Sequence, residues 1–406
     1  MVKSNLFYSD LIDKYGAKHY KKYDVTFAKG RGALVWDAEG KEYIDMLSCY
    51  SSVSQGHCNK NIRKASRRQG KTLTLVSGAV YNTEVGLLLK KVCELSGMEA
   101  ALLKNGGVEA VELAIKAMRA NGYKRGIEPD KAEIIVADNN FHGRTTTVIS
   151  FSSDDVSKDG FGPLTQGFRS VPYNDLSALE SAINENTAGV LLEPIQGEAG
   201  VVMPEEGYLK GARELCTEKG IILTLDEIQT GLGRTGKMFA FEHYDVRPDI
   251  TIMGKALGGG YYPISGIATS RDIMDNAFVP GSDGSTHGEN PLAGAVGLAA
   301  IHELERKWFS TGRNLIENSA YLGDYFMRSL EEIASSLVSE IRGKGLLIGM
   351  EFGDPIARDV SKRLIKEGIF AKDSHKYTIR FAPPLMIPMK LVNRALSKIE
   401  KVLKEF

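Results

Sequence analysis

The sequence lacks the features that would place the chain in a membrane or export it. Its longest apolar runs, such as residues 188–192, are far too short to cross a bilayer. Residues 1–8 mix polar and aromatic side chains and contain no apolar stretch of signal-peptide length. We therefore expect a cytoplasmic protein.

Cysteine and histidine are scarce, and neither forms a recognisable motif. The four cysteines show no paired spacing, and no two of the seven histidines have the spacing of a zinc-binding helix. We expect neither a disulfide framework nor a structural metal.

Neither sign of charge is in excess, since Lys plus Arg and Asp plus Glu each number 51. No net field therefore favours nucleic acid or an acidic membrane.

Short β-branched or leucine-rich runs alternate with longer amphipathic stretches in this chain of 406 residues, which is 43% hydrophobic. This rhythm predicts an α/β fold with a mainly parallel sheet. The predicted strands are residues 101–104, 133–137, 146–151, 189–192, 221–225, 249–253 and 265–268. The predicted helices between them are residues 108–121, 175–183 and 208–219.

The pattern changes near Pro291. Long helices are predicted at residues 292–307 and 314–336, followed by an apolar strand at 345–352 and a final helix from Val392. A second, smaller C-terminal domain is therefore expected. No internal repeat, low-complexity tract or Pro/Ser-rich linker interrupts the chain, so we expect the two parts to pack tightly.

Two residues at the ends of predicted strands indicate cofactor chemistry. Lys255 lies among small residues in the segment 252–260, and Asp226 ends the apolar run 223–225. A lysine amine can bond covalently to an aldehyde, and a buried aspartate can keep a pyridine nitrogen protonated so that the ring accepts electrons. Together, and not singly, they predict a pyridoxal phosphate site.

Two glycine-bearing turns are candidates for binding phosphate. At Gly106-Gly107 a strand ends and a helix begins, so backbone N–H groups and the helix dipole would meet a phosphate there, although an ordinary strand-to-helix turn has the same pattern. The segment 231–236 matches the spaced glycines of dinucleotide sites. No helix is predicted after it, so nicotinamide binding is not expected.

Several motifs, in order along the chain, resemble the class III (ω-) aminotransferases, and among them the enzymes that act on ornithine. The motifs are residues 139–145, 193–198, 226–231, 254–255, 284–286 and 379–384. The resemblance implies the type I fold of pyridoxal phosphate-dependent transferases. It further implies a segment 1–50 packing with the small domain, a large cofactor-binding domain at 51–290 and a small domain at 291–406.

The resemblance also implies roles for the cofactor residues. Lys255 would hold the cofactor covalently and then move a proton, while Asp226 would pair with the ring nitrogen. The remaining cofactor-binding residues would be Gly107, Val108, Phe141, Gln229, Ser285 and Thr286. In this family Thr286 matches a position that reaches the phosphate of the neighbouring subunit, which implies a homodimer with shared active sites.

The substrate-binding residues implied by the resemblance are Tyr20, Tyr50, Arg144, Glu198 and Arg380. Arg380 would hold the α-carboxylate of glutamate, but would pair with Glu198 when ornithine binds. Arg144 and Tyr20 would then hold the distal end of the amino acid. The planar guanidinium suits a carboxylate better than a lysine amine does.

The sequence departs from the ornithine enzymes mainly around the substrate. The changed positions are Gly78, Val80, His142, His287 and Glu289. His142 replaces a tryptophan and is similar to the residue of acetylornithine aminotransferases. Glu289 stands where the family has glycine. Its carboxylate would hold a cationic substrate if it faced the site, and would have no catalytic role if it faced outward.

The sequence thus predicts a homodimeric pyridoxal phosphate-dependent aminotransferase that moves the terminal amino group of ornithine, or a related basic amino acid, to 2-oxoglutarate. A semialdehyde and glutamate would be the products. The alternatives are a racemase or epimerase of the same fold, a transaminase for acetylornithine or another ω-amine, and a pyridoxal-binding protein without catalytic activity. The first would need no oxoacid, and intact Lys255 and Asp226 argue against the last.

Overall fold

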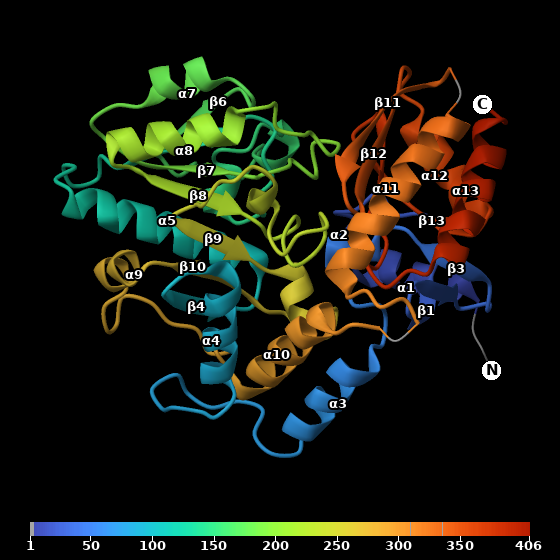
Figure 1. Cartoon of the computed structure of the whole chain (residues 1–406), viewed down its shortest axis with the longest axis horizontal. Helices are drawn as coiled ribbons and strands as arrows, with labels where there is room; N and C mark the ends of the chain where they lie inside the picture. Colours follow the sequence, from blue (N-terminus) through green and yellow to red (C-terminus); the bar gives the residue numbers. More distant parts are fainter. Residues whose placement is uncertain (1–3, 309, 335) are drawn as a thin grey trace.

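The computed structural model describes residues 4–308, 310–334 and 336–406, and the residues it describes form three β-sheets. The largest sheet lies on one side of the molecule, and the C-terminal elements lie on the other together with the N-terminal strands (Figure 1). Its seven strands have the order β4-β10-β9-β8-β7-β5-β6. In chain order they are β4 Ala100–Lys104, β5 Glu133–Ala137, β6 Phe168–Val171, β7 Thr187–Leu192, β8 Ile222–Asp226, β9 Ile250–Met253 and β10 Ser265–Thr269.

This sheet confirms the expected mainly parallel α/β arrangement. The neighbouring strands from β9 to β6 are all parallel, while β10 runs antiparallel to both β9 and β4. Every residue of β7, β8, β9 and β10 is buried, as expected for strands covered on both faces. Strand β6 was not expected from the sequence.

The strand predicted at residues 146–151 is wrong. Residues Thr146–Ile149 form the short helix α6, which packs against α5 and buries Val148 and Ile149. Strand β6 instead occupies the edge beside β5, in parallel register from Ile134 opposite Phe168 to Ala137 opposite Val171. Strand preference of β-branched residues is weak, and here the packing against α5 decides the structure.

Helices cover both faces of this sheet, and alternate residues of one strand pack on opposite sides. Ile134 and Val136 of β5 join the cluster around α5, whereas Ile135 and Ala137 join the cluster that contains α7 and α8. The helices of this part are α2 Ser48–Ser51, α3 Lys60–Gln69, α4 Val85–Ser96, α5 Gly107–Lys124, α6 Thr146–Ile149, α7 Leu176–Ala182, α8 Tyr208–Lys219, α9 Arg271–Ala277 and α10 Pro291–Glu305. The 3-10 turns are η1 Asp155–Ser157, η2 Ala240–His243 and η3 Lys255–Gly258.

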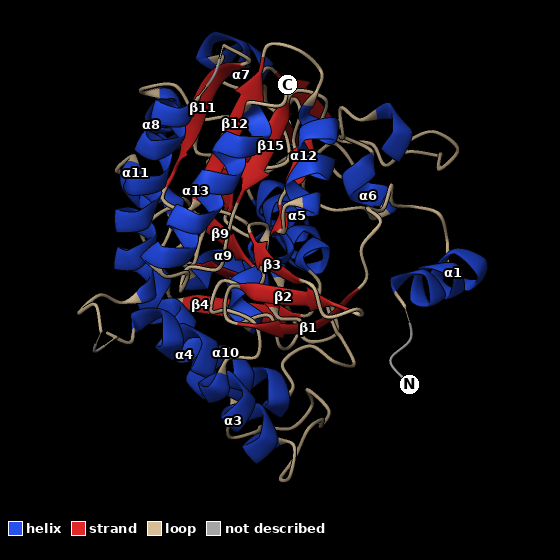
Figure 2. Ribbon diagram, turned by 90° about the vertical axis from the view of Figure 1, so that its right-hand side faces the viewer, coloured by secondary structure: helices blue, strands red, loops and turns tan. Residues whose placement is uncertain are grey.

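The C-terminal part contains an antiparallel sheet of order β11-β12-β15-β14 with helices packed on it (Figure 2). The strand expected at 345–352 is β12, and the final helix is α13. The helix expected at 314–336 is α11, and Ser335 near its expected end lies outside the described residues. The elements are α11 Leu315–Ile333, β11 Val338–Lys344, β12 Leu347–Phe352, α12 Ala357–Lys366, β14 Lys372–Ser374, β15 Thr378–Phe381 and α13 Met389–Leu403.

The third sheet joins the two ends of the chain, with the order β1-β2-β3-β13. Its strands are β1 Phe27–Arg31, β2 Leu34–Asp37, β3 Glu42–Asp45 and β13 Ile369–Phe370. Strand β13 pairs in parallel with β3, so Ile369 lies opposite Ile44. Helix α1, Asn5–Tyr15, precedes this sheet, buries no residue and extends away from the rest of the chain (Figure 2). The three-part division of the sequence stays a prediction.

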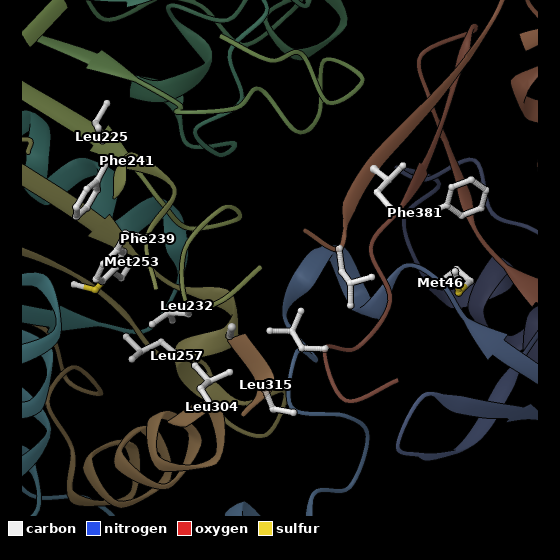
Figure 3. Close-up of a cluster of buried hydrophobic side chains, with 14 of the residues drawn as sticks. Met46, Leu225, Leu232, Phe239, Phe241, Met253, Leu257, Leu304, Leu315 and Phe381 are labelled. Atoms are coloured by element: carbon white, nitrogen blue, oxygen red, sulfur yellow. The ribbon is translucent and has the colours of Figure 1, made fainter. Parts of the chain in front are cut away.

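One hydrophobic cluster connects the large and the C-terminal parts. Figure 3 shows Leu225, Phe239 and Leu257 on one side and Met46 and Phe381 on the other, and all five belong to this cluster.

A buried arginine ties the same parts together with hydrogen bonds. Arg234 is fully buried, and its NH1 group donates to the carbonyls of Leu346 and Pro383 at 2.9 and 2.6 Å. Its NH2 group donates to the hydroxyls of Ser48 and Ser54. The glycine-rich segment around it is therefore a structural turn, and it is followed by the short 3-10 turn η2 rather than by an α-helix.

Within the described ranges, no helix combines the length and apolar character needed to span a membrane. The four cysteines are free thiols.

Candidate active site

A cavity of about 220 Å³ opens where strands β5, β7 and β8 end. Carboxyl ends of parallel strands are the usual position of ligand sites in α/β sheets. The cavity is lined by Gly107, Val108, Phe141, His142, Gly143, Glu193, Ile195, Glu198, Asp226, Ile228, Gln229, Thr230 and Lys255. The fold thus brings together Lys255 and Asp226, on which the sequence-based prediction depends.

Asp226 is the last residue of β8, and its carboxylate is held from two sides. Its Oδ1 atom accepts from the backbone N–H of Ile228 at 3.0 Å, and Oδ2 lies 2.8 Å from Nδ1 of His142. A carboxylate oxygen is the acceptor in such a contact, so Nδ1 of His142 is assigned as the donor. Burial alone would lower the pKa of His142, but the hydrogen bond to Asp226 and the charges of Asp226 and Glu193 together outweigh burial and raise that pKa. His142 is therefore a positioning residue for Asp226.

Lys255 follows β9 and Gly254 and opens the turn η3. Its backbone has a left-handed φ of +42°, which few residues with a side chain adopt. Burial lowers the pKa of Lys255, against the opposing effect of the Glu198 and Asp226 carboxylates. A lowered pKa favours the neutral amine, which is the form that attacks an aldehyde and accepts a proton.

Helix α5 begins at the cavity, and Gly107 and Val108 form its first turn. The first N–H groups of a helix have no partner within the helix, so they are available to an anion. A Cβ atom at Gly107 would lie only 3.2 Å from Cδ1 of Ile228. Glycine therefore leaves space between the start of the helix and the side chain beside it.

Glu193 is a buried carboxyl group in the cavity to which the sequence assigned no role. It follows β7 directly, and its Oε2 atom accepts from the backbone N–H of Phe141 at 3.0 Å. Burial raises the pKa of Glu193 to about 7, with the nearby Asp226 carboxylate adding to the shift. A glutamate directly after a fully buried strand was the available signal.

Arg380 and Glu198 form an ion pair next to the cavity. Arg380 of β15 is 1% exposed, and its NH1 group donates to Oε1 of Glu198 at 2.7 Å and to the carbonyl of Gly197 at 2.9 Å. Burial would raise the pKa of Glu198, but the charge and hydrogen bond of Arg380, together with the charges of Lys255 and Lys372, lower it to about 2. Gln229 lies between them, with its amide nitrogen 3.4 Å from Glu198 and its oxygen 3.4 Å from Arg380.

The other expected substrate residues lie toward solvent, around two larger cavities of about 650 and 500 Å³. Tyr20 and Tyr50 line the first, and Arg144 lines the second together with Glu198. Arg144 is exposed, lies over the ring of Phe141 at 5.3 Å and pairs with Asp154 at 3.4 Å.

Tyr50 belongs to the segment Ser48–Ser51, in which all four residues have positive φ angles. This unusual left-handed turn, labelled α2, places its ring 5.4 Å from the Arg380 guanidinium.

The remaining positions lie outside the 220 Å³ cavity. Ser285, Thr286 and His287 are exposed on the loop before α10, and Gly78 and Val80 are exposed on another loop. Glu289 turns its carboxylate to the edge of the sheet, where it accepts from the backbone N–H of Leu103 at 3.3 Å. Its φ is +55°, in the region where glycine is favoured.

Known proteins resemble this chain over nearly its whole length. The family described as aminotransferase class-III matches residues 15–403. An ornithine aminotransferase of Halalkalibacterium halodurans is 46% identical over 393 residues, which are 97% of each chain. The crystal structure of the ornithine aminotransferase from Toxoplasma gondii superposes with a TM-score of 0.95 at 39% identity, covering 99% of this chain and 96% of that one. The acetylornithine aminotransferase of Elizabethkingia anophelis gives a TM-score of 0.88 at 39% identity, with all of both chains covered.

Proposed function

The chain belongs to the class III aminotransferases, as its motifs predicted, and from this premise we propose that it transfers the terminal amino group of ornithine to 2-oxoglutarate. A semialdehyde and glutamate would be the products. The choice of ornithine is supported by the names of relatives that match over nearly the full length of both chains.

The observation that carries this proposal is the Arg380–Glu198 ion pair beside Lys255. When glutamate binds, Arg380 must be free of Glu198 so that it can pair with the α-carboxylate. When a substrate reacts through a terminal amine, it brings no carboxylate near Arg380. A carboxylate that neutralises the arginine lets the same site accept both substrates.

The cavity has the donor set that pyridoxal phosphate requires. Lys255 supplies an amine, Asp226 a buried carboxylate for the ring nitrogen, and the first turn of α5 supplies N–H groups for the phosphate. Gln229 would donate to the phenolic oxygen, and Phe141 would pack on the ring face. When bound, pyridoxal phosphate supplies an aldehyde that carries the amino group and a ring that accepts electrons.

The residues around the cavity move protons and hold the charged groups of the site in position. Lys255 Nζ would take up the proton that leaves the amine-bearing carbon of the substrate, for which its lowered pKa suits it. The Asp226 carboxylate accepts from the N–H of Ile228 and lies 2.8 Å from Nδ1 of His142, so its orientation toward the cavity is fixed from two sides. His142 thereby holds Asp226 in position rather than acting on the substrate.

Substrate exchange would depend on which partner Arg380 has. With ornithine, Glu198 would keep Arg380 paired, and Arg144, Tyr20 and Tyr50 would surround the distal end. With glutamate or 2-oxoglutarate, the α-carboxylate would displace Glu198 from Arg380.

We also propose a homodimer. Ser285 and Thr286 are exposed in the single chain, where a neighbouring subunit's phosphate could reach them. Helix α1 buries no residue and exposes large apolar side chains, among them Leu6, Leu11 and Ile12. A cytoplasmic location stays a prediction from the sequence.

The test is to mix the purified protein, loaded with pyridoxal phosphate, with ornithine and 2-oxoglutarate. Formation of glutamate, together with the ring-closed imine of the semialdehyde, is expected. Loss of the α-hydrogen or racemisation of ornithine without any oxoacid would instead support the racemase alternative.

N-acetylornithine is the second candidate donor. His142 favours it, because this residue is similar to the one in acetylornithine aminotransferases, and one such enzyme superposes over the whole chain. A kcat/KM that is higher for N-acetylornithine than for ornithine would select this candidate.

A further inference from the structure

Lys372 stands directly beside Arg380 at the substrate site. Strands β14 and β15 are antiparallel, and Lys372 is the residue opposite Arg380. Directly opposed residues of neighbouring strands project from the same face of a sheet. The Lys372 amine lies 5.8 Å from the centre of the Tyr50 ring, and the Arg380 guanidinium lies 5.4 Å from it. Both cations therefore face the same tyrosine.

Only one of these two cations has an ionic partner. Glu198 pairs with Arg380, whereas Lys372 forms no salt bridge with any residue that the structure describes. Among the described residues, the amine of Lys372 donates to the backbone carbonyl of Asp373 alone, at 3.1 Å. The carboxylate of Asp373 pairs with Arg358 instead. A half-buried cation opposite another cation is unfavourable, and the nearby Glu198 and Asp373 carboxylates, each paired with an arginine, offset this cost without pairing with Lys372. A further anion that binds to Lys372 would therefore be stabilised there.

Lys372 also lines both of the larger cavities beside the site. It lines the 650 Å³ cavity together with Tyr20 and Tyr50, and the 500 Å³ cavity together with Arg144 and Glu198. It is thus shared by the two cavities that contain the residues expected to hold the distal end of the substrate. Burial lowers the pKa of Lys372, against the opposing effect of Glu198.

We propose that Lys372 binds the substrate carboxylate that is distal to the reacting carbon, while Glu198 keeps Arg380 paired. This inference rests on the proposed function, because it names a further specificity residue of the same site. Arg144 is exposed and held by Asp154, so Lys372 is the more sheltered cation for a carboxylate that enters. An ammonium in a half-buried position gives a stronger charge-assisted contact than an exposed one.

The first test compares kinetics of Lys372→Met with those of the wild type. For ornithine, KM should rise and kcat/KM should fall about 10- to 100-fold, as expected for the loss of one charge-assisted hydrogen bond. For 1,4-diaminobutane, which has the same terminal amine and no carboxylate, kcat/KM should not fall. Lys372→Arg should restore most of the ornithine activity. An unchanged KM for ornithine, or an equal loss with both amines, would overturn the proposal.

A second test does not need turnover. Pentanedioate, a dicarboxylate without a reacting group, is titrated calorimetrically into the protein loaded with cofactor. Binding should weaken about tenfold or more in Lys372→Met. Lys21→Met is the matched control, because Lys21 is an exposed lysine on the 650 Å³ cavity, and it should bind as the wild type does. Equal weakening in both variants, or no binding to the wild type, would overturn the proposal even if ornithine proved not to be the substrate.

Discussion

Arg380 donates to the Glu198 carboxylate at 2.7 Å, although 182 residues separate the two in the chain. The pair lies beside Lys255, and Arg380 is almost fully buried. Breaking such a pair leaves an uncompensated charge unless another anion replaces the lost partner. An α-carboxylate is such an anion, so the pair distinguishes a substrate that has a carboxylate at this point from one that does not.

Glu198→Ala should favour the glutamate half-reaction over the ornithine half-reaction. Without Glu198, Arg380 would be free for an α-carboxylate, but would stay unpaired when ornithine binds. We expect the ratio of kcat/KM for glutamate to that for ornithine to increase about tenfold or more. Single-turnover absorbance measurements of each half-reaction test this. Glu206→Ala, an exposed glutamate, is the control. Equal effects on both half-reactions would contradict the proposed exchange.

Glu193→Gln should change how stability depends on pH. The folded pKa of about 7 lies above the ordinary value of 4.5, so the folded state keeps a proton that the unfolded state loses. Wild-type stability should therefore fall as pH rises through this window, at a cost of up to roughly 3 kcal/mol above it. The glutamine cannot ionise and still accepts from Phe141 N–H.

The measurement is thermal unfolding of the cofactor-free variant and wild type at about pH 5 and about pH 8. The Tm of Glu193→Gln relative to the wild type should be higher at the higher pH. Glu205→Gln, at an exposed position, should show no such trend. A difference that does not change with pH would contradict a raised pKa of Glu193 in the folded protein.

Arg234→Met should destabilise the fold. The change leaves the carbonyls of Leu346 and Pro383 without their donor in a buried region. We expect a loss of roughly 3 kcal/mol in the free energy of unfolding, measured in urea, since each buried unpaired acceptor costs about 1 to 3 kcal/mol. Arg328→Met, an exposed arginine on α11, should change it little. Similar losses in both would show that the four hydrogen bonds of Arg234 contribute nothing.

The sequence predicted the elements whose signal is local. Strand β8 and the carboxylate of Asp226 could be identified because a mostly apolar run ends in an acid, and α8 was predicted over its observed range. The error at residues 146–151 arose because two threonines and two β-branched apolar residues favour a strand, while packing on α5 made a helix. No local pattern could show that β13 would pair with β3.

The sequence did not predict the site residues that are brought together only by the pairing of strands or the meeting of strand ends. Lys372 precedes Asp373 in a charged, unremarkable segment, and only the pairing of β14 with β15 places it opposite Arg380. His142 was expected only as a position changed from the ornithine enzymes, and its bond to Asp226 depends on two strand ends that meet in the fold. Glu289 was considered for the site because of its position in the sequence, but its carboxylate turns away and accepts from Leu103 N–H.

The account depends most on Lys255 as the amine that holds the cofactor. Sodium borohydride makes a bond between a lysine and an aldehyde permanent, so the protein loaded with pyridoxal phosphate is reduced, digested and analysed by mass spectrometry. The account predicts the added pyridoxyl phosphate mass on Lys255, and its absence from that peptide after prior incubation with ornithine. A label on another lysine such as Lys104 or Lys372, with Lys255 unmodified, would contradict it.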